Sequence, residues 1–156
     1  MSKDIKLDQV HKVDKLMNKF GFYKAFNFMT SIPTETITEV KESVRLIVKL
    51  IDNSRTSPYP CNTMTPYCPL PDTGLYMAVQ KLGFKPPQNL EGWTHIDTED
   101  VVGTRKQIRP WLTEEQASYA VLADKKVAET SVHFTGKDRD DKMIDRALDS
   151  LRQIAI

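Results

Sequence analysis

The strongest constraint on the fold is a helical stripe of apolar residues in the second quarter of the chain. Five β-branched residues recur there at three- and four-residue spacing: Ile37, Val40, Val44, Ile47 and Ile51. An α-helix places residues with this spacing on one face. Thr36 precedes the stripe and Glu39 follows three residues later, the pattern of a capping box. The sequence therefore predicts a core helix from Thr36 to Asn53.

Two further segments carry a helical stripe that ends in Gly-Phe. The first stripe is Val10, Val13, Leu16, Met17 and Phe20, and the second is Leu75, Ala78, Val79 and Leu82. Gly21 and Gly83 follow at the positions where a left-handed residue closes a helix in a Schellman cap. We expect Asp72 to cap the start of the second helix.

The C-terminal third predicts two more helices and a strand. Thr113 and Gln116 resemble a capping box, followed by apolar residues at Ala117, Ala120, Val121 and Val127. Residues 130–135 alternate between apolar and polar, which predicts a lone strand. The final helix is expected to follow three acids that suit a helix N-terminus, Asp138, Asp140 and Asp141, and its stripe runs from Met143 to Ile154.

Prolines dominate residues 54–72, at Pro58, Pro60, Pro66, Pro69 and Pro71. Proline fixes φ and donates no backbone hydrogen bond, so this segment is expected to form a long loop outside the core, with neither helix nor central strand. Residues 21–33 are aromatic-rich and are compatible with a short helix or a buried extended stretch. Residues 89–110 are ambiguous, with Thr98 as one start for a short helix toward Ile108.

These patterns predict a mainly α fold, a compact bundle-like packing of four to five helices with a long Pro-rich loop and at most a minor β element. At 156 residues the chain has the length of a single domain, 1–156, and its 40% hydrophobic content is typical of a globular protein.

Composition also restricts the setting and the partners. A net charge of +1 gives no global attraction to nucleic acid or an anionic membrane, so such binding would need a local patch. No apolar run is long enough to span a bilayer and no export signal is seen, so we expect a cytoplasmic protein with no membrane partner. No phosphate-binding glycine loop occurs, and no cofactor is expected.

The cysteines and histidines are candidates for chemistry. Six residues separate Cys61 from Cys68, which is wider than the usual zinc-binding pair, and His95 and His133 would have to complete the site. A hydrolase of nucleotides or phosphoesters would use His95, Asp97 and His133 as its catalytic set. The acids after Thr98 also fit a helix N-terminus, which explains them without catalysis.

Two segments are candidates for partner contacts. Tyr59 and Tyr67 lie among the prolines, where a stiff segment loses little entropy on docking. The second segment combines positive charge with an aromatic ring, through Arg105, Lys106, Arg109 and Trp111.

The leading hypothesis is a small intracellular accessory or assembly protein that binds a macromolecular partner. A protein partner or a homo-oligomer is favoured over nucleic acid, which stays an alternative. The other hypotheses are the hydrolase described above and a structural subunit of a larger particle.

Overall fold

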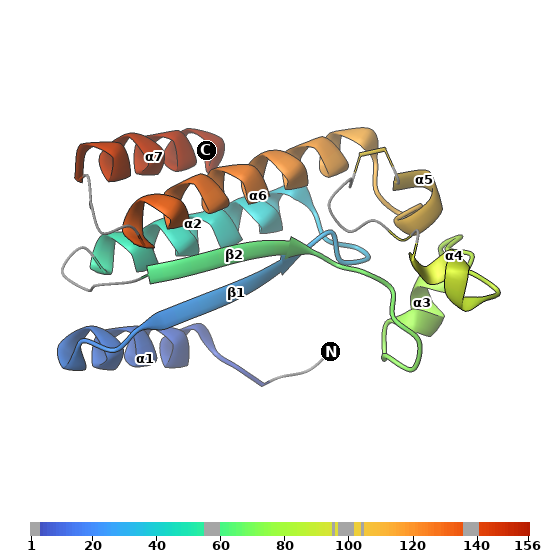
Figure 1. Cartoon of the computed structure of the whole chain (residues 1–156), viewed down its shortest axis with the longest axis horizontal. Helices are drawn as coiled ribbons and strands as arrows, with labels where there is room; N and C mark the ends of the chain where they lie inside the picture. The colour runs from blue at the N-terminus through green and yellow to red at the C-terminus, as the bar shows by residue number, and fades with distance from the viewer. Residues whose placement is uncertain (1–3, 55–59, 95, 97–101, 104, 136–140) are drawn as a thin grey trace.

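The computed structural model describes residues 4–54, 60–94, 96, 102–103, 105–135 and 141–156 (Figure 1). Within these residues the protein is mainly helical, with seven helices and a two-stranded parallel sheet. The helices are α1 (Leu7–Phe20), α2 (Ile37–Asn53), α3 (Tyr76–Lys81), α4 (Leu90–Thr94), α5 (Arg105–Ile108), α6 (Glu114–Thr135) and α7 (Asp141–Ile154), and the strands are β1 (Lys24–Thr30) and β2 (Pro60–Pro66). The prediction of a mainly α fold with a minor β element is confirmed.

The sheet is built by a β1–α2–β2 unit. The two strands pair in parallel, with Lys24 opposite Pro60 and Thr30 opposite Pro66. Parallel neighbours need a long crossover, and α2 provides it. Residues 24–30, within the segment that the sequence left open, therefore form an extended strand.

The expected loop at residues 54–72 contains this second strand, which corrects the sequence prediction. Pro60 and Pro66 stand at the two ends of β2, and the five residues between them include no proline. A strand with only one strand neighbour tolerates proline at its ends, because few ladder bonds are lost. Met64 of β2 is fully buried, so this part of the segment belongs to the core.

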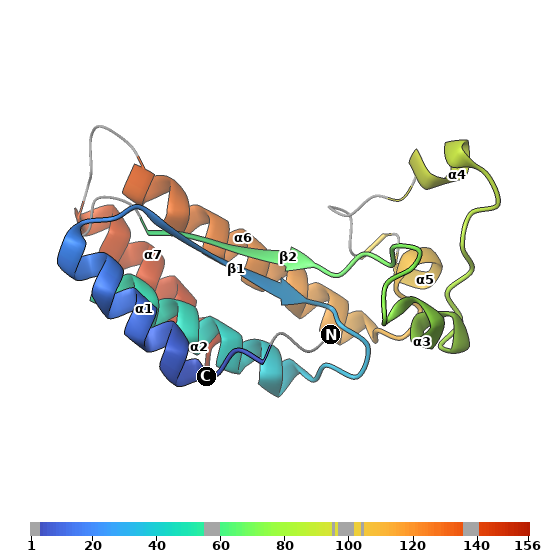
Figure 2. The same cartoon turned by 90° about the horizontal axis from the view of Figure 1, so that it is seen from below.

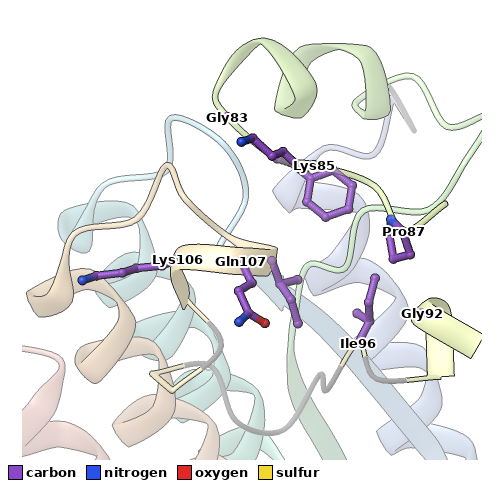
Figure 3. Close-up of a pocket in the computed structure, with 9 residues that line it drawn as sticks. Gly83, Lys85, Pro87, Gly92, Ile96, Lys106 and Gln107 are labelled. Carbon is purple, nitrogen blue, oxygen red and sulfur yellow. The ribbon is translucent and has the colours of Figure 1, made fainter.

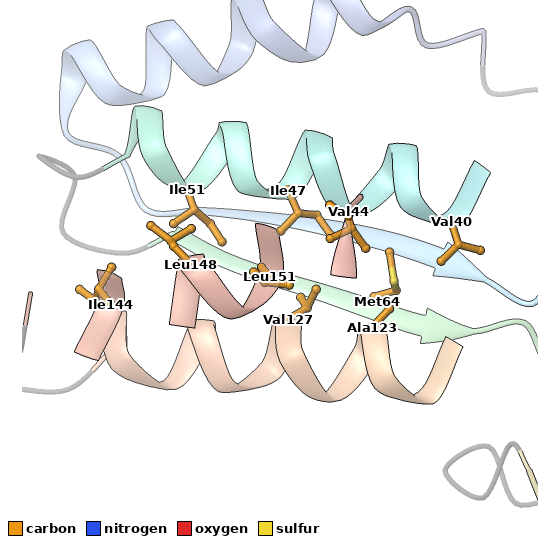
Figure 4. Packing of buried hydrophobic residues seen from close by; sticks show 11 residues of the cluster. Val40, Val44, Ile47, Ile51, Met64, Ala123, Val127, Ile144, Leu148 and Leu151 are labelled. Atoms are coloured by element: carbon orange, nitrogen blue, oxygen red, sulfur yellow. The ribbon is translucent and has the colours of Figure 1, made fainter. Parts of the chain in front are cut away.

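Helices α2 and α6 lie against the sheet, and α7 packs against both of these helices (Figure 1). Their apolar side chains meet Met64 in a single cluster (Figure 4). Val44, Ile47, Leu148 and Leu151 have no exposed surface. Burying one such side chain contributes about 1.5–3 kcal/mol, so this cluster is the main source of stability for the unit.

Helix ends follow the sequence signals in most places. Thr36 and Glu39 form the expected capping box, as do Thr113 and Gln116. Gly21 and Gly83 adopt positive φ, and the Phe22 amide donates to the Met17 carbonyl at 3.0 Å, as in a Schellman cap. The cap expected at Asp72 is wrong, because α3 begins only at Tyr76 and Asp72 lies in a left-handed turn at φ 61°.

Helix α6 is continuous to Thr135, so the lone strand predicted for residues 130–135 is wrong. The helical spacing continues through Ala123, Val127 and Thr130, which are all buried, and this packing outweighs the local alternation. Of the expected helix starts, Asp138, Asp140 and Thr98 lie outside the described residues.

Helix α1 does not bury the stripe that predicted it. Val13, Leu16 and Phe20 are between 46% and 62% exposed. The helix instead packs on α2 with Asp14 facing inward, at the edge of the molecule (Figure 2). Most of the stripe that predicted this helix therefore lies outside the core.

A buried polar cluster holds α1 in place. Lys24 Nζ forms an ion pair with Asp14, and both side chains are at least 99% buried. The same ammonium donates to Asn18 Oδ1 at 2.6 Å, and Asn53 Nδ2 donates to Asp14 Oδ2 at 3.1 Å. Since these residues come from α1, β1 and α2, the cluster joins three elements in one network.

We predict that Asp14→Asn lowers the free energy of unfolding by about 3 kcal/mol, because the substitution removes the carboxylate that is paired with the buried Lys24 side chain. Urea unfolding monitored by circular dichroism measures the change. The matched control is Asp8→Asn at the exposed start of α1, expected to cost at most about 0.5 kcal/mol. Equal losses in the two variants would contradict the role of the ion pair.

Candidate functional site

Three of the expected contact residues lie at the carboxyl ends of the strands. Arg109 is fully buried and its Nε donates to the Tyr67 carbonyl at 2.9 Å. Trp111 is half-buried, and its Nε1 donates to the Ser31 carbonyl at 3.1 Å while its ring lies 6.1 Å from that of Tyr67. Tyr67 is also buried, so Arg109 and Tyr67 offer no open surface to a partner and instead tie the segment before α6 to the strand ends.

The remaining expected contact residues are not brought together with these. Arg105 is half-buried and donates from Nη1 to the Leu112 carbonyl at 2.8 Å. Lys106 is exposed on α5. Tyr59 lies outside the described residues.

His95 and Asp97 lie outside the described residues, and for His133 in α6 and Cys61 in β2 only the backbone is described. Cys68 is half-buried, and burial raises the pKa of its thiol, against the opposing charge of Arg109. In the described part of the chain, no three His, Cys, Asp or Glu side chains are grouped as a metal ion requires.

A cavity of about 430 Å³ lies between α5 and the segments on either side of α4 (Figure 3). Its lining includes Phe84, Pro87, Ile96 and Ile108, with the carboxamide of Gln107 as a polar group. Figure 3 shows Lys106 extending to the other side of α5 from Gln107. The described wall combines these apolar side chains with the polar residues Lys85, Lys106 and Gln107.

The largest of the described cavities is on the face of the sheet opposite the buried Met64. We call it the open groove; its volume is about 1030 Å³, and it is lined by Asp4, Ile5, Asn27, Phe28, Met29, Ile32, Pro33, Thr34, Thr63, Thr65 and Leu75. Strand alternation explains the floor, because Asn27 and Met29 point to this face while Phe26 and Phe28 are half-buried.

The floor of the open groove is a pair of matched rungs across the two strands. Asn27 is opposite Thr63, and Met29 is opposite Thr65. Thr63 Oγ1 donates to Asn27 Oδ1 at 2.9 Å, which fixes both side chains of the first rung. Met29 is 41% exposed and presents an apolar surface at the second rung.

The loop after β1 forms the end wall and carries backbone strain. Ser31 and Thr34 adopt positive φ, at 64° and 72°, a region that costs non-glycine residues about 1–2 kcal/mol. Glu35 holds the loop by accepting hydrogen bonds from the Ser31 amide at 2.6 Å and from Thr30 Oγ1 at 3.0 Å. Such strain recurs at binding sites, and here it shapes the wall of the groove.

The sequence of β1 carries a signal for this site. Lys24-Ala-Phe-Asn-Phe-Met-Thr30 alternates aromatic and other residues with the period of a strand. Its partner in β2 is flanked by prolines, and that context led to the expectation of a loop. Without a second strand, the first could not be placed in a sheet or given an exposed face.

No family model, curated protein or solved structure matches this chain. Among the described helices, none has both the length and the apolar character that crossing a membrane requires. The function proposed below is therefore based on the geometry of the described residues.

We predict that the difference in stability between Glu35→Gln and the natural protein shifts in favour of the variant as pH rises from acidic to neutral. Burial raises the pKa of the Glu35 carboxyl above its ordinary value of 4.5, against opposing hydrogen bonds from Thr30 and Ser31. Because the folded state then holds the proton more tightly, stability falls as pH rises through this range. The amide oxygen of Gln can accept the same two bonds without ionising.

Urea unfolding at several pH values measures the difference, with Glu39→Gln as the control. Hydrogen bonds from the Thr36 amide and hydroxyl lower the pKa of Glu39, so that variant is expected to lose relative stability as pH rises. Parallel pH trends in the two variants would contradict the assignment.

Proposed function

We propose that this protein is a small accessory or assembly protein that binds a protein partner across the open groove. The observation that carries the proposal is the parallel sheet with one face left uncovered. Parallel sheets occur almost only with both faces covered by helices. In the described residues, Asn27, Met29, Thr63 and Thr65 are nevertheless exposed on one face.

The chemistry of the open groove favours an uncharged, apolar side of a partner helix. Its lining contains one charged side chain, Asp4, and several apolar ones, among them Ile5, Met29 and Leu75. A helix laid on the sheet would bury Met29 and the methyl groups of Thr63 and Thr65, which supplies the hydrophobic contact that drives association.

Nucleic acid is a poorer fit to the same surface. Binding to phosphates depends on Lys and Arg contacts, and neither residue type lines the open groove.

A reducing compartment such as the cytoplasm fits the cysteine content. The sequence has two cysteines, too few for the disulfide framework typical of small secreted proteins.

The test is a photo-crosslinking residue, p-benzoylphenylalanine, placed at Thr65 in the groove or at Met77 on the exposed side of α3 as the control. We expect a discrete product with another protein from Thr65 and not from Met77. Adding Met29→Lys should reduce the yield of the Thr65 product at least about tenfold, because a buried charge disfavours docking. Met29 is 41% exposed, so the fold should survive.

Equal products from both positions would contradict the proposal, as would a Thr65 product that Met29→Lys leaves unchanged. A crosslinked product that contains only this chain would mean that the partner is a second copy of the protein. Circular dichroism of each variant verifies that the fold is kept.

A further inference from the structure

The exposed side of α1 carries large apolar side chains. Successive helix residues are about 100° apart, so Val13, Leu16 and Phe20 form one apolar row on this side. All three are at least 46% exposed. Monomeric proteins rarely leave a row of large apolar side chains uncovered without a binding role.

A row of positive charge runs beside the apolar row. Lys12, Lys15 and Lys19 are exposed and share one side of the helix, next to Leu16. Asp8 lies on the same side and lowers the local charge by one. Asp14, the other acid of α1, is on the inner side in its ion pair with Lys24.

Aromatic side chains extend the apolar row beyond the helix. Gly21 turns the chain at φ 66°, and Phe22 and Tyr23 follow it at 60% and 57% exposure. The rings of Phe20 and Phe22 are 6.2 Å apart, and Lys19 Nζ lies 5.5 Å from the centre of the Phe20 ring. The turn therefore presents a cluster of aromatic rings next to a lysine.

We propose that α1 and the turn after it bind the surface of an anionic lipid bilayer. Basic helices with an aromatic and aliphatic row lie in the membrane interface, where apolar side chains enter the headgroup region. Lysines beside that row attract anionic headgroups, and aromatic rings are favoured at this depth. The protein docks on the bilayer through α1 without crossing it.

Shape and charge favour a bilayer over a protein at this surface. Helix α1 lies at the edge of the molecule (Figure 2), and the rings of Phe20, Phe22 and Tyr23 are exposed there. Exposed rings at an edge can enter a fluid interface without a matching cavity. The lysine row complements anionic lipid. The sequence led us to expect no membrane partner, because no apolar run spans a bilayer and no export signal is seen. The net charge of +1 still allowed binding through a local patch.

The proposal is independent of the partner proposed for the open groove, because none of the exposed residues in the α1 row lines that groove. The test is sedimentation of the full chain with vesicles of phosphatidylserine and phosphatidylcholine, beside pure phosphatidylcholine vesicles. We expect binding to the anionic vesicles that weakens as salt is added. Neutral vesicles should bind far less.

Two pairs of variants locate the surface. A triple variant should weaken vesicle binding about 100-fold, at about fivefold per lysine. It combines Lys12→Gln, Lys15→Gln and Lys19→Gln. The matched control, Lys81→Gln with Lys85→Gln and Lys106→Gln, removes three other exposed lysines and should have little effect.

The apolar contribution is tested in the same assay. Phe20→Ser with Phe22→Ser should weaken binding at least about tenfold. Met77→Ser with Leu90→Ser, which alters exposed side chains of α3 and α4, should not. Absence of binding to anionic vesicles at low salt would overturn the proposal, and it is the result expected if α1 binds an acidic protein instead. Equal effects of the α1 and control variants would also overturn it.

Discussion

The parallel pairing of β1 and β2 is the constraint on which the rest of the structure depends. Because parallel neighbours require a crossover, the chain must pass through α2 before β2 can form. α6 and α7 then join α2 on the same face, around Met64. With only two strands and one helical layer in the described residues, the opposite face stays exposed and becomes the open groove.

The sequence predicted the helices well because helix signals are local. Capping pairs such as Thr36 with Glu39, and the glycine at position 21, act within one turn, and the structure confirms them. β2 was missed because its formation depends on pairing with residues far away in the chain, and neither strand is informative without the other. The expected strand at residues 130–135 failed for the same reason: packing of Val127 and Thr130 decided in favour of a helix.

The candidate site was harder to predict than the fold. Arg109 and Trp111 resembled a binding patch because a charged and an aromatic residue were close in sequence, yet burial gives Arg109 a structural role beside Tyr67. Conversely, the stripe of α1 predicted a helix with one apolar face, but the inward position is taken by Asp14. Periodicity shows which side of a helix is apolar; it does not show which side is buried when a polar pair such as Asp14 and Lys24 can hold the helix instead.

Methionine oxidation tests most directly whether residues 60–66 form a buried strand beside an open sheet face. Met64 is fully buried against α2 and α6, whereas Met29 is 41% exposed in the open groove. Brief treatment of the folded protein with hydrogen peroxide, followed by peptide mass spectrometry, should convert Met29 to the sulfoxide and leave Met64 protected. Oxidation of Met64 as fast as Met29 would show that the segment is not in the core, and the open groove would then have no floor.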